Sequence, residues 1–332
     1  MKVTAKQIAE AMGISTAAVS MALNNKPGVS EKLRRQVIST ARSMGYDFTR
    51  IDAKRSASKT VGFVFFHKNF VFDTPFFTEL ATSTELYLKQ SGYQLSVCHI
   101  HDLDNIDEQV RMLDSCHYAG IILLGTTISR EEFLPFMKLS APLVLLDTRF
   151  PGLNVNSVSI ANQDGAFAAT DYLISRWQAQ PGYLHASQSV ANFAQREEGF
   201  FGAVRAHSMS VSKSVVHKLS PSLEGACADM LAILKNGEPI ARCYFADNDE
   251  IALGAMRAFK EVGYRIPEDV AIIGFDNLSY SSIAQPPLST YHIPKGFMGM
   301  CAASLLLNVI QNKYKETVNV QINGKLIIRD SA

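Results

Sequence analysis

Apolar residues recur at helical spacing in three short segments within the first 46 residues of the chain. A hydroxyl residue stands before each segment, at Thr4, Ser15 and Ser30, where its oxygen can cap the first turn of a helix. Gln7 completes a capping-box pattern with Thr4, and Gly13 suits the left-handed position that follows a helix. Two short helices joined by a glycine turn and braced by a third are typical of a helix-turn-helix.

From Val61 onward, buried-strand runs alternate with helical segments. The expected strands are 61–66, 93–100, 120–125, 142–147, 157–160, 181–186, 214–217, 242–246, 270–276, 318–323 and 325–330. The expected helices are 75–91, 104–116, 131–139, 164–176, 197–207, 223–235, 249–262 and 294–311. This alternation predicts an α/β fold of doubly wound parallel sheets, and two such series predict two lobes around a cleft. Ligands of such sheets bind beyond the carboxyl ends of the strands.

The segment between these two regions is polar and basic, without an apolar stripe. We therefore expect a helix-turn-helix domain at 1–46, a hinge or linker at 47–60 and a two-lobed body at 61–332. We place the N-terminal lobe at 61–160 plus 291–320. We place the C-terminal lobe at 161–290 plus 321–332.

The distribution of charge separates the head from the body. The first 59 residues hold 11 basic and 4 acidic residues, a net charge of +7. The remaining 21 basic and 27 acidic residues give the rest of the chain a net charge of −6. A basic head on an acidic body is what binding of nucleic acid through the head alone requires. The second helix of the head is the one expected in the major groove.

Composition argues against several other classes of protein. No apolar run approaches the roughly 18 residues of a membrane span, and the N-terminus lacks the apolar core of a signal peptide, so we expect a cytoplasmic protein without a membrane partner. The five cysteines are widely spaced and form no CxxC pair, which favours reduced core thiols.

Motifs of catalysis and of metal binding are also missing from the sequence. It contains no phosphate-binding loop, no nucleophile elbow and no HExxH motif, so we expect neither an enzyme nor a bound cofactor. The pair His99 and His101 lacks the further ligands of a metal site, so we expect no metal.

Several segments of the sequence resemble those of the LacI/GalR repressor family. In the head these are VTAKQIAEAMGIS, AAVSMALN and KPGVSEKLRRQVISTARSMGY, and in the body they include NQDGAFAATDYL, ADNDEIALGAMRAF, IPEDVAIIGFDN and PPLSTYHIP. In the body, the segment 177–186 departs from the family pattern. The resemblance implies a homodimeric repressor that binds double-stranded operator DNA. It also implies a body like a periplasmic sugar-binding protein, with a small-molecule effector, most often a sugar, between its lobes.

The resemblance places the base-reading positions of the head on Thr16, Ala17 and Met21. The family usually has arginine, which reads guanine, where Met21 stands, so we expect an altered operator preference. DNA binding itself is expected to persist, because phosphate contacts carry much of the affinity. Positions that resemble phosphate-contacting ones are Thr4, Ser15, Ser20 and Asn24.

The hinge departs further from the family, whose hinge helix inserts leucines into the minor groove of DNA. Here the segment is shorter by about two residues and carries Ser56 and Ala57 where a leucine is expected. Lys54 and Arg55 are expected to contact phosphates. A hinge that kinks DNA and a flexible tether both fit this sequence.

The resemblance also identifies effector-binding positions, most of them at predicted strand ends. They are His67, Phe76, Phe77, Asp147, Phe193, Arg196, Asn248 and Asp276, with Arg196 at the start of a helix. Carboxylates, a guanidinium and an amide suit the hydroxyls of a polyol, and an aromatic ring suits the apolar face of a sugar. Alternatively, one of the two phenylalanines is core, and the two aspartates cap loops or helices. Arg149, after the fourth strand, is better explained by a surface ion pair.

The sequence leaves the sign of the effector's influence open, since members of the family respond to inducers or to corepressors. A different class also fits: a cytoplasmic small-molecule-binding protein or enzyme whose head no longer binds DNA. Salt-dependent binding to DNA from the gene's own promoter separates the two.

Overall fold

The computed structural model of the chain describes residues 3–24, 26, 28–46, 58–66, 75–101, 105–313 and 316–332. Three residues predicted to bind DNA or effector, namely Lys54, Arg55 and His67, lie outside the described residues, as does most of the predicted hinge. Within the described parts, no helix combines the length and the apolar character needed to cross a membrane.

The head consists of three helices, α1 (Ala5–Met12), α2 (Thr16–Leu23) and α3 (Glu31–Ser43). Each begins with the predicted cap, because the side-chain oxygens of Thr4, Ser15 and Ser30 accept backbone N–H bonds from the first turn. The capping box is complete, since the Thr4 N–H donates to Gln7 Oε1 at 2.8 Å. Gly13 has a φ of +65°, as expected after a helix.

A small apolar core holds these helices together, formed by Ile8, Ala9, Val19, Ala22, Leu23, Val37 and Ala41. Arg34 of α3 is buried beside it, and its guanidinium donates to the carbonyls of Met21, Ala22 and Lys26. Arginine therefore closes the C-terminal end of α2, where carbonyl groups lack partners within the helix.

The body contains two sheets of six strands each. The first has the order β11-β5-β4-β3-β1-β2, with every neighbouring pair parallel. Its strands are β1 (Thr60–Phe66), β2 (Gln94–Ile100), β3 (Gly120–Leu124), β4 (Leu143–Leu146), β5 (Asn156–Ile160) and β11 (Asn319–Ile322). Its helices are α5 (Pro75–Gln90), α6 (Ile106–Ser115), α7 (Arg130–Phe133) and α12 (Lys295–Ile310).

The second sheet has the order β12-β10-β9-β8-β6-β7, parallel except for β12. Its strands are β6 (Gly182–Ala186), β7 (Val216–Leu219), β8 (Cys243–Ala246), β9 (Ala271–Asp276), β10 (Ser289–His292) and β12 (Lys325–Ile327). The helices α8 (Asn162–Trp177), α9 (Ala191–Ala206), α10 (Leu223–Lys235) and α11 (Asp249–Glu261) accompany them.

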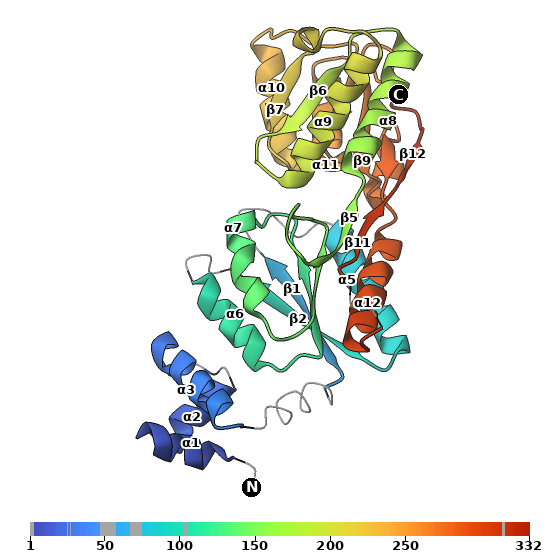
Figure 1. Cartoon of the computed structure of the whole chain (residues 1–332). Coiled ribbons are helices and arrows are strands. Elements are labelled where there is room, and N and C mark those ends of the chain that lie inside the picture. The colour runs from blue at the N-terminus through green and yellow to red at the C-terminus, as the bar shows by residue number, and fades with distance from the viewer. Residues whose placement is uncertain are drawn as a thin grey trace.

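The chain crosses between the lobes three times, after β5, after β10 and after β11 (Figure 1). An apolar cluster continues across these crossings, because Val158 and Met298 of the first lobe belong to the same cluster as Phe275 of the second. The parallel strands of both sheets end toward this junction, which places the cleft there.

Some details of the sequence interpretation were wrong. Helix α9 begins at Ala191, before the predicted 197, so Arg196 lies within the helix and does not begin it. The predicted helix 131–139 is one α-helical turn followed by the 3-10 helix Leu134–Lys138. Strand β10 was not predicted.

One further expectation needs correction, on the cysteines. Strand β10 extends to His292 and β11 to Ile322, so the last two crossings lie close to the approximate positions 290 and 320. Of the five cysteines, only Cys227 and Cys243 are buried, and Cys116 is exposed.

Candidate functional site

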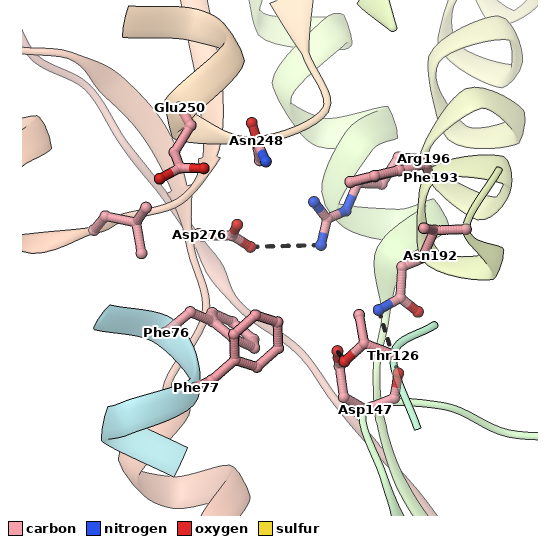
Figure 2. A pocket seen from close by; sticks show the side chains of 12 residues that line it. Phe76, Phe77, Thr126, Asp147, Asn192, Phe193, Arg196, Asn248, Glu250 and Asp276 are labelled. Atoms are coloured by element: carbon pink, nitrogen blue, oxygen red, sulfur yellow. Dashed lines mark hydrogen bonds and ion pairs between the residues drawn. The ribbon is translucent and has the colours of Figure 1, made fainter. Parts of the chain in front are cut away.

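A cleft lies between the two lobes, at the carboxyl ends of both sheets (Figure 2). Its space, counted together with the open solvent at its mouth, amounts to about 460 Å³. Its walls are formed by Phe76, Phe77, Thr126, Asp147, Val190, Asn192, Phe193, Arg196, Asn248, Glu250, Asp276 and Leu278.

The structure brings together seven of the eight residues that the sequence predicted for an effector site; the eighth, His67, lies outside the described residues. Both Phe76 and Phe77 line the cleft and also belong to the apolar core, with their rings edge to face at 5.3 Å. The two interpretations of these rings are therefore compatible. Arg149 is exposed and is not part of the wall.

Asp147 follows β4 and is almost fully buried, with a φ of +66°. Its Oδ2 accepts a hydrogen bond from the Thr126 hydroxyl at 2.6 Å. Its Oδ1 is also buried, yet it has no hydrogen-bond partner among the described residues. Burial raises the pKa of Asp147 to about 6, although the Thr126 hydroxyl lowers it. Asp147 therefore presents an unsatisfied acceptor in the wall of the cleft.

Arg196 is held in place by three protein groups. Its Nε donates to Asn162 Oδ1 at 2.9 Å, one terminal nitrogen donates to the Asp247 carbonyl, and the other lies 3.4 Å from Asp276 Oδ1. The guanidinium also stacks over the Phe275 ring, 3.8 Å from its centroid. Three of its five N–H donors are thus used, and two remain for a ligand.

A buried row of amides joins Arg196 to the first lobe. Asn162, which accepts from Arg196, donates to Asn192 Oδ1 at 3.1 Å. Asn192 in turn donates to the Asp147 carbonyl at 3.2 Å. This row links the guanidinium in the second lobe to the strand end that carries Asp147 in the first. Figure 2 shows its last step, from Asn192 to Asp147.

Asp276 ends β9 in a strained part of the backbone, since Asp276 has a φ of +105° and Asn277 a φ of +53°. The Nζ of Lys295, on α12 of the first lobe, donates to the carbonyls of Asp276 at 2.8 Å and of Asn277 at 3.3 Å. Burial raises the pKa of Asp276, while Arg196 and Lys295 lower it. A buried lysine from one lobe therefore holds a wall residue of the other.

The opposite side of the same turn is held by Asp249, the first residue of α11. Its carboxylate accepts from the Leu278 N–H at 2.7 Å, the Ser281 hydroxyl at 2.6 Å and the Thr290 hydroxyl at 2.5 Å. Burial, and then the nearby charge of Asp276, raise the pKa of Asp249 to about 7. Asp249 does not line the cleft, so its role is to position the turn.

Asn248 has two roles in the structure. Its side-chain oxygen caps α11 by accepting from the Ile251 N–H at 2.8 Å, while the residue also lines the cleft. Beside it, Glu250 accepts from the Tyr280 hydroxyl at 3.0 Å, and burial raises the pKa of Glu250.

Sequence reasoning missed five wall residues: Thr126, Val190, Asn192, Glu250 and Leu278. Thr126 stands just beyond the end of β3, where ligands of parallel sheets bind, whereas Glu250 is the second residue of α11. Asn192 was missed because the start of α9 was placed too late.

The head offers a second candidate site on one face of α2. Thr4, Ser15, Thr16, Ala17 and Ser20 are exposed, and Met21 and Asn24 are half-buried, whereas Val19, Ala22 and Leu23 turn into the core. The side-chain amide of Asn24 donates a hydrogen bond to the Ser20 carbonyl at 2.8 Å. The residues predicted to read bases therefore share one accessible helix face, as a recognition helix requires.

Two parts of the chain match models of known protein families. Residues 4–47 match the model of bacterial regulatory proteins of the lacI family, and residues 170–332 match that of the periplasmic binding protein-like domain. The chain is 27% identical to the HTH-type transcriptional repressor PurR of Mannheimia succiniciproducens, over 99% of this chain and 98% of that protein. It is also 27% identical to the probable repressor ExuR of Bacillus subtilis, with the same coverage.

Several solved structures are similar to the chain. A complex of the transcriptional regulator CelR with cellobiose superposes with a TM-score of 0.75 at 25% identity, covering 100% of both chains. A LacI family regulator from Enterococcus faecium with bound ribose gives 0.71 at 25% identity, over 82% of this chain and 98% of that one. The fold is shared with the lac repressor dimer bound to operator, with a TM-score of 0.74 at 20% identity over 100% and 99% of the chains. The relatives and structures named here are regulators.

Proposed function

We propose that the protein is a cytoplasmic repressor whose affinity for operator DNA is controlled by a sugar bound in the cleft. The chain belongs to the LacI family of DNA-binding transcriptional regulators, which supports this proposal. The observation that carries the proposal is the pairing, in one chain, of an exposed recognition face on α2 with an interlobe cleft that contains unsatisfied polar groups. The two sites are held by separate apolar cores.

At the DNA, Thr16 offers a hydroxyl and a methyl group, and Ala17 and Met21 offer apolar contact such as that with thymine methyls. The exposed hydroxyls of Thr4, Ser15 and Ser20 flank them and suit phosphate oxygens. We therefore expect an operator core in which A·T pairs face the N-terminal part of α2.

In the cleft, the free Oδ1 of Asp147 can accept a ligand hydroxyl, and the two unused N–H groups of Arg196 can donate to another. Phe76, Phe77 and Phe193 supply apolar wall suited to the face of a sugar ring. The solved relatives with cellobiose and ribose support a sugar as the effector.

We further propose a homodimer, since a two-fold pair of heads matches a palindromic operator. A groove on the second lobe supplies an apolar surface, lined by Leu223, Leu253, Met256, Tyr280, Ile283 and Ala284. Ile283 is 78% exposed there, which is unusual for a large apolar side chain. The lac repressor structure with a similar fold is a dimer on its operator.

Control then requires two arrangements of the lobes that the effector binds with different affinity. The amide row from Arg196 through Asn162 and Asn192 spans the lobes, and so does the bond from Lys295 to the Asp276 carbonyl. A ligand that engages Asp147 and Arg196 together would favour the arrangement in which these contacts persist. The measured response to the sugar decides whether it acts as inducer or corepressor.

A gel-shift titration of the full chain on DNA from its own promoter, at several salt concentrations, tests the DNA-binding half of the proposal. We expect specific binding that weakens with salt. Ala17→Glu puts a negative charge on the exposed face of α2 and should lower affinity by at least about tenfold. Ala206→Glu, at the exposed end of α9, is the matched control and should leave affinity unchanged.

Absence of binding above the nonspecific background would refute the regulator and favour a small-molecule-binding protein with an inactive head. The effector half is tested by thermal shift of the full chain against a panel of sugars. An Asp276→Ala variant that keeps the full ligand response would contradict the assignment of the cleft.

A further inference from the structure

The charges of the cleft wall are unbalanced. Among the described residues, the ionisable side chains that line it are Asp147, Glu250, Asp276 and Arg196. Three carboxylates thus face one guanidinium. That guanidinium lies against Asp276, at 3.4 Å, so its charge is already partly compensated.

Neighbouring positive groups do not reverse this balance. The Nζ of Lys295 is directed at the carbonyls of Asp276, Asn277 and Ile293 and is not part of the wall. The helices α5 and α9 begin at the cleft without an acidic residue in the first turn, and each N-terminus acts as roughly half a positive charge. Together they offset about one carboxylate. The N-terminus of α11 is offset by its own Asp249.

In the part of the wall that the structure describes, an anionic ligand would therefore meet more carboxylates than cations. To bind the two unused N–H groups of Arg196, it would have to share the guanidinium with the Asp276 carboxylate, which already compensates part of its charge. The free Oδ1 of Asp147 would also face the anion, although it needs a hydrogen-bond donor. A hydroxyl group satisfies Oδ1, whereas a carboxylate or phosphate oxygen can only accept.

On these grounds, and resting on the proposed function, we propose that the cleft takes a polyol without negative charge and rejects the phosphorylated and carboxylated forms of the same sugar. Asp147 is the residue that enforces this choice, since it combines burial, an open acceptor and no direct ion pair among the described residues. The regulator would then sense a sugar before a kinase or an oxidising enzyme has given it a negative charge.

In the experiment, the full chain is titrated with sugars at pH 8, and binding is measured by thermal shift and by calorimetry. Neutral sugars are compared with their charged derivatives: D-ribose with D-ribose 5-phosphate, D-glucose with D-glucose 6-phosphate and D-glucuronate, and cellobiose with cellobionate. We expect every stabilising compound to be neutral, and its charged derivative to bind at least about tenfold more weakly. A charged derivative that binds as tightly as its parent would overturn the proposal.

Variants locate the source of the discrimination. Asp147→Asn should shrink the ratio of affinities between the neutral sugar and its anionic derivative by at least about tenfold. Asp107→Asn, an exposed aspartate on α6, should leave the ratio unchanged. An unchanged ratio in Asp147→Asn would show that another group discriminates, and would overturn the role of Asp147.

The same chain, tested on promoter DNA, separates this proposal from the proposed function. If the chain binds the promoter but no sugar of either kind stabilises it, the polyol assignment fails while the DNA-binding function stands. If promoter binding is absent but neutral sugars bind selectively, the regulator fails and the charge selection stands.

Discussion

Replacing Lys295 by methionine removes the buried ammonium that joins α12 of the first lobe to the turn after β9 in the second. Lys295 is only 2% exposed, and its Nζ donates to Asp276 O at 2.8 Å and to Asn277 O and Ile293 O at 3.3 Å. Its nearest carboxylate oxygen belongs to Glu79, at 3.8 Å, on a side chain that is half-exposed. Methionine keeps most of the volume and removes the charge.

The expected loss follows from these contacts. A hydrogen bond from a charged donor contributes about 1.5–3 kcal/mol, and each buried carbonyl left without a partner costs about 1–3 kcal/mol. Burying the ammonium itself costs several kcal/mol, which the variant recovers. The bond to Glu79 adds little because it is long and partly exposed. We therefore expect Lys295→Met to lower the free energy of unfolding by about 2–4 kcal/mol.

The variant should also weaken the effector site. Asp276 and Asn277 both have positive φ values, and such strain persists only where surrounding contacts impose it. Without Lys295 we expect the turn to relax and Asp276 to move away from Arg196. Effector affinity should then fall by at least about tenfold, since each 1.4 kcal/mol is a factor of ten.

Urea unfolding followed by circular dichroism gives the stability, and calorimetric titration with the sugar identified by thermal shift gives the affinity. Lys313→Met, at an exposed position beyond α12, is the control and should change stability by less than about 0.5 kcal/mol. If the two variants unfold alike, the hydrogen bonds of Lys295 do not stabilise the fold. If stability falls but affinity does not, the lysine supports the fold without positioning Asp276.

Three further predictions concern packing, capping and pH. Gly299→Ala should lower the free energy of unfolding by about 1–3 kcal/mol, because the added Cβ would lie 2.6 Å from the Leu80 carbonyl oxygen of α5. The control, Gly296→Ala on the same helix, places its Cβ within 4 Å of no other atom and should not destabilise the protein. Equal unfolding midpoints of the two variants would refute this prediction. Ser30→Ala should cost the head about 1 kcal/mol by removing the cap of α3, measured by thermal unfolding, and no loss would contradict the cap. Burial raises the pKa of Asp249 to about 7, so the free energy of unfolding should fall by up to about 4 kcal/mol as pH rises from about 4 to 7. In Asp249→Asn the free energy of unfolding should depend less on pH over this range. A pH profile that the substitution leaves unaltered would show that Asp249 does not titrate there.

Elements with local signals could be predicted from the sequence. The three helices of the head were found because a hydroxyl cap precedes each one, and α10, predicted at 223–235, does begin at Leu223, after the cap of Ser222. Helix α9 shows the limit of this reasoning. Its N-cap is Val190, which makes no side-chain cap, so nothing in the sequence marks the true start. Strand β10 has four residues without an apolar run, and pairing with β9 and β12 creates it.

The cleft shows a similar limit. Asp147, Asn248 and Asp276 could be identified because the resemblance to the LacI/GalR family points to them, and each lies at or just after the end of a predicted strand, where ligands of parallel sheets bind. Lys295 and Asp249 could not, because both act through contacts with residues distant in sequence. Lys295 lies 19 positions from the carbonyl of Asp276, and Asp249 lies 41 positions from Thr290. Both charged side chains are buried and stabilise the turn after β9 through hydrogen bonds. The periodicity of apolar residues does not predict such contacts.

Burial also changes the meaning of the charge count in the head. Arg34 contributes to the net charge of +7 in the first 59 residues, but its guanidinium faces carbonyls at the end of α2. A phosphate contact by a basic side chain adds about one unit to the slope of log affinity against log salt. Arg34→Gln should therefore lower the thermal stability of the head while leaving that slope, measured by gel shift on promoter DNA, unchanged. A slope reduced by about one would mean that Arg34 contacts phosphate and that its place inside the head is wrong.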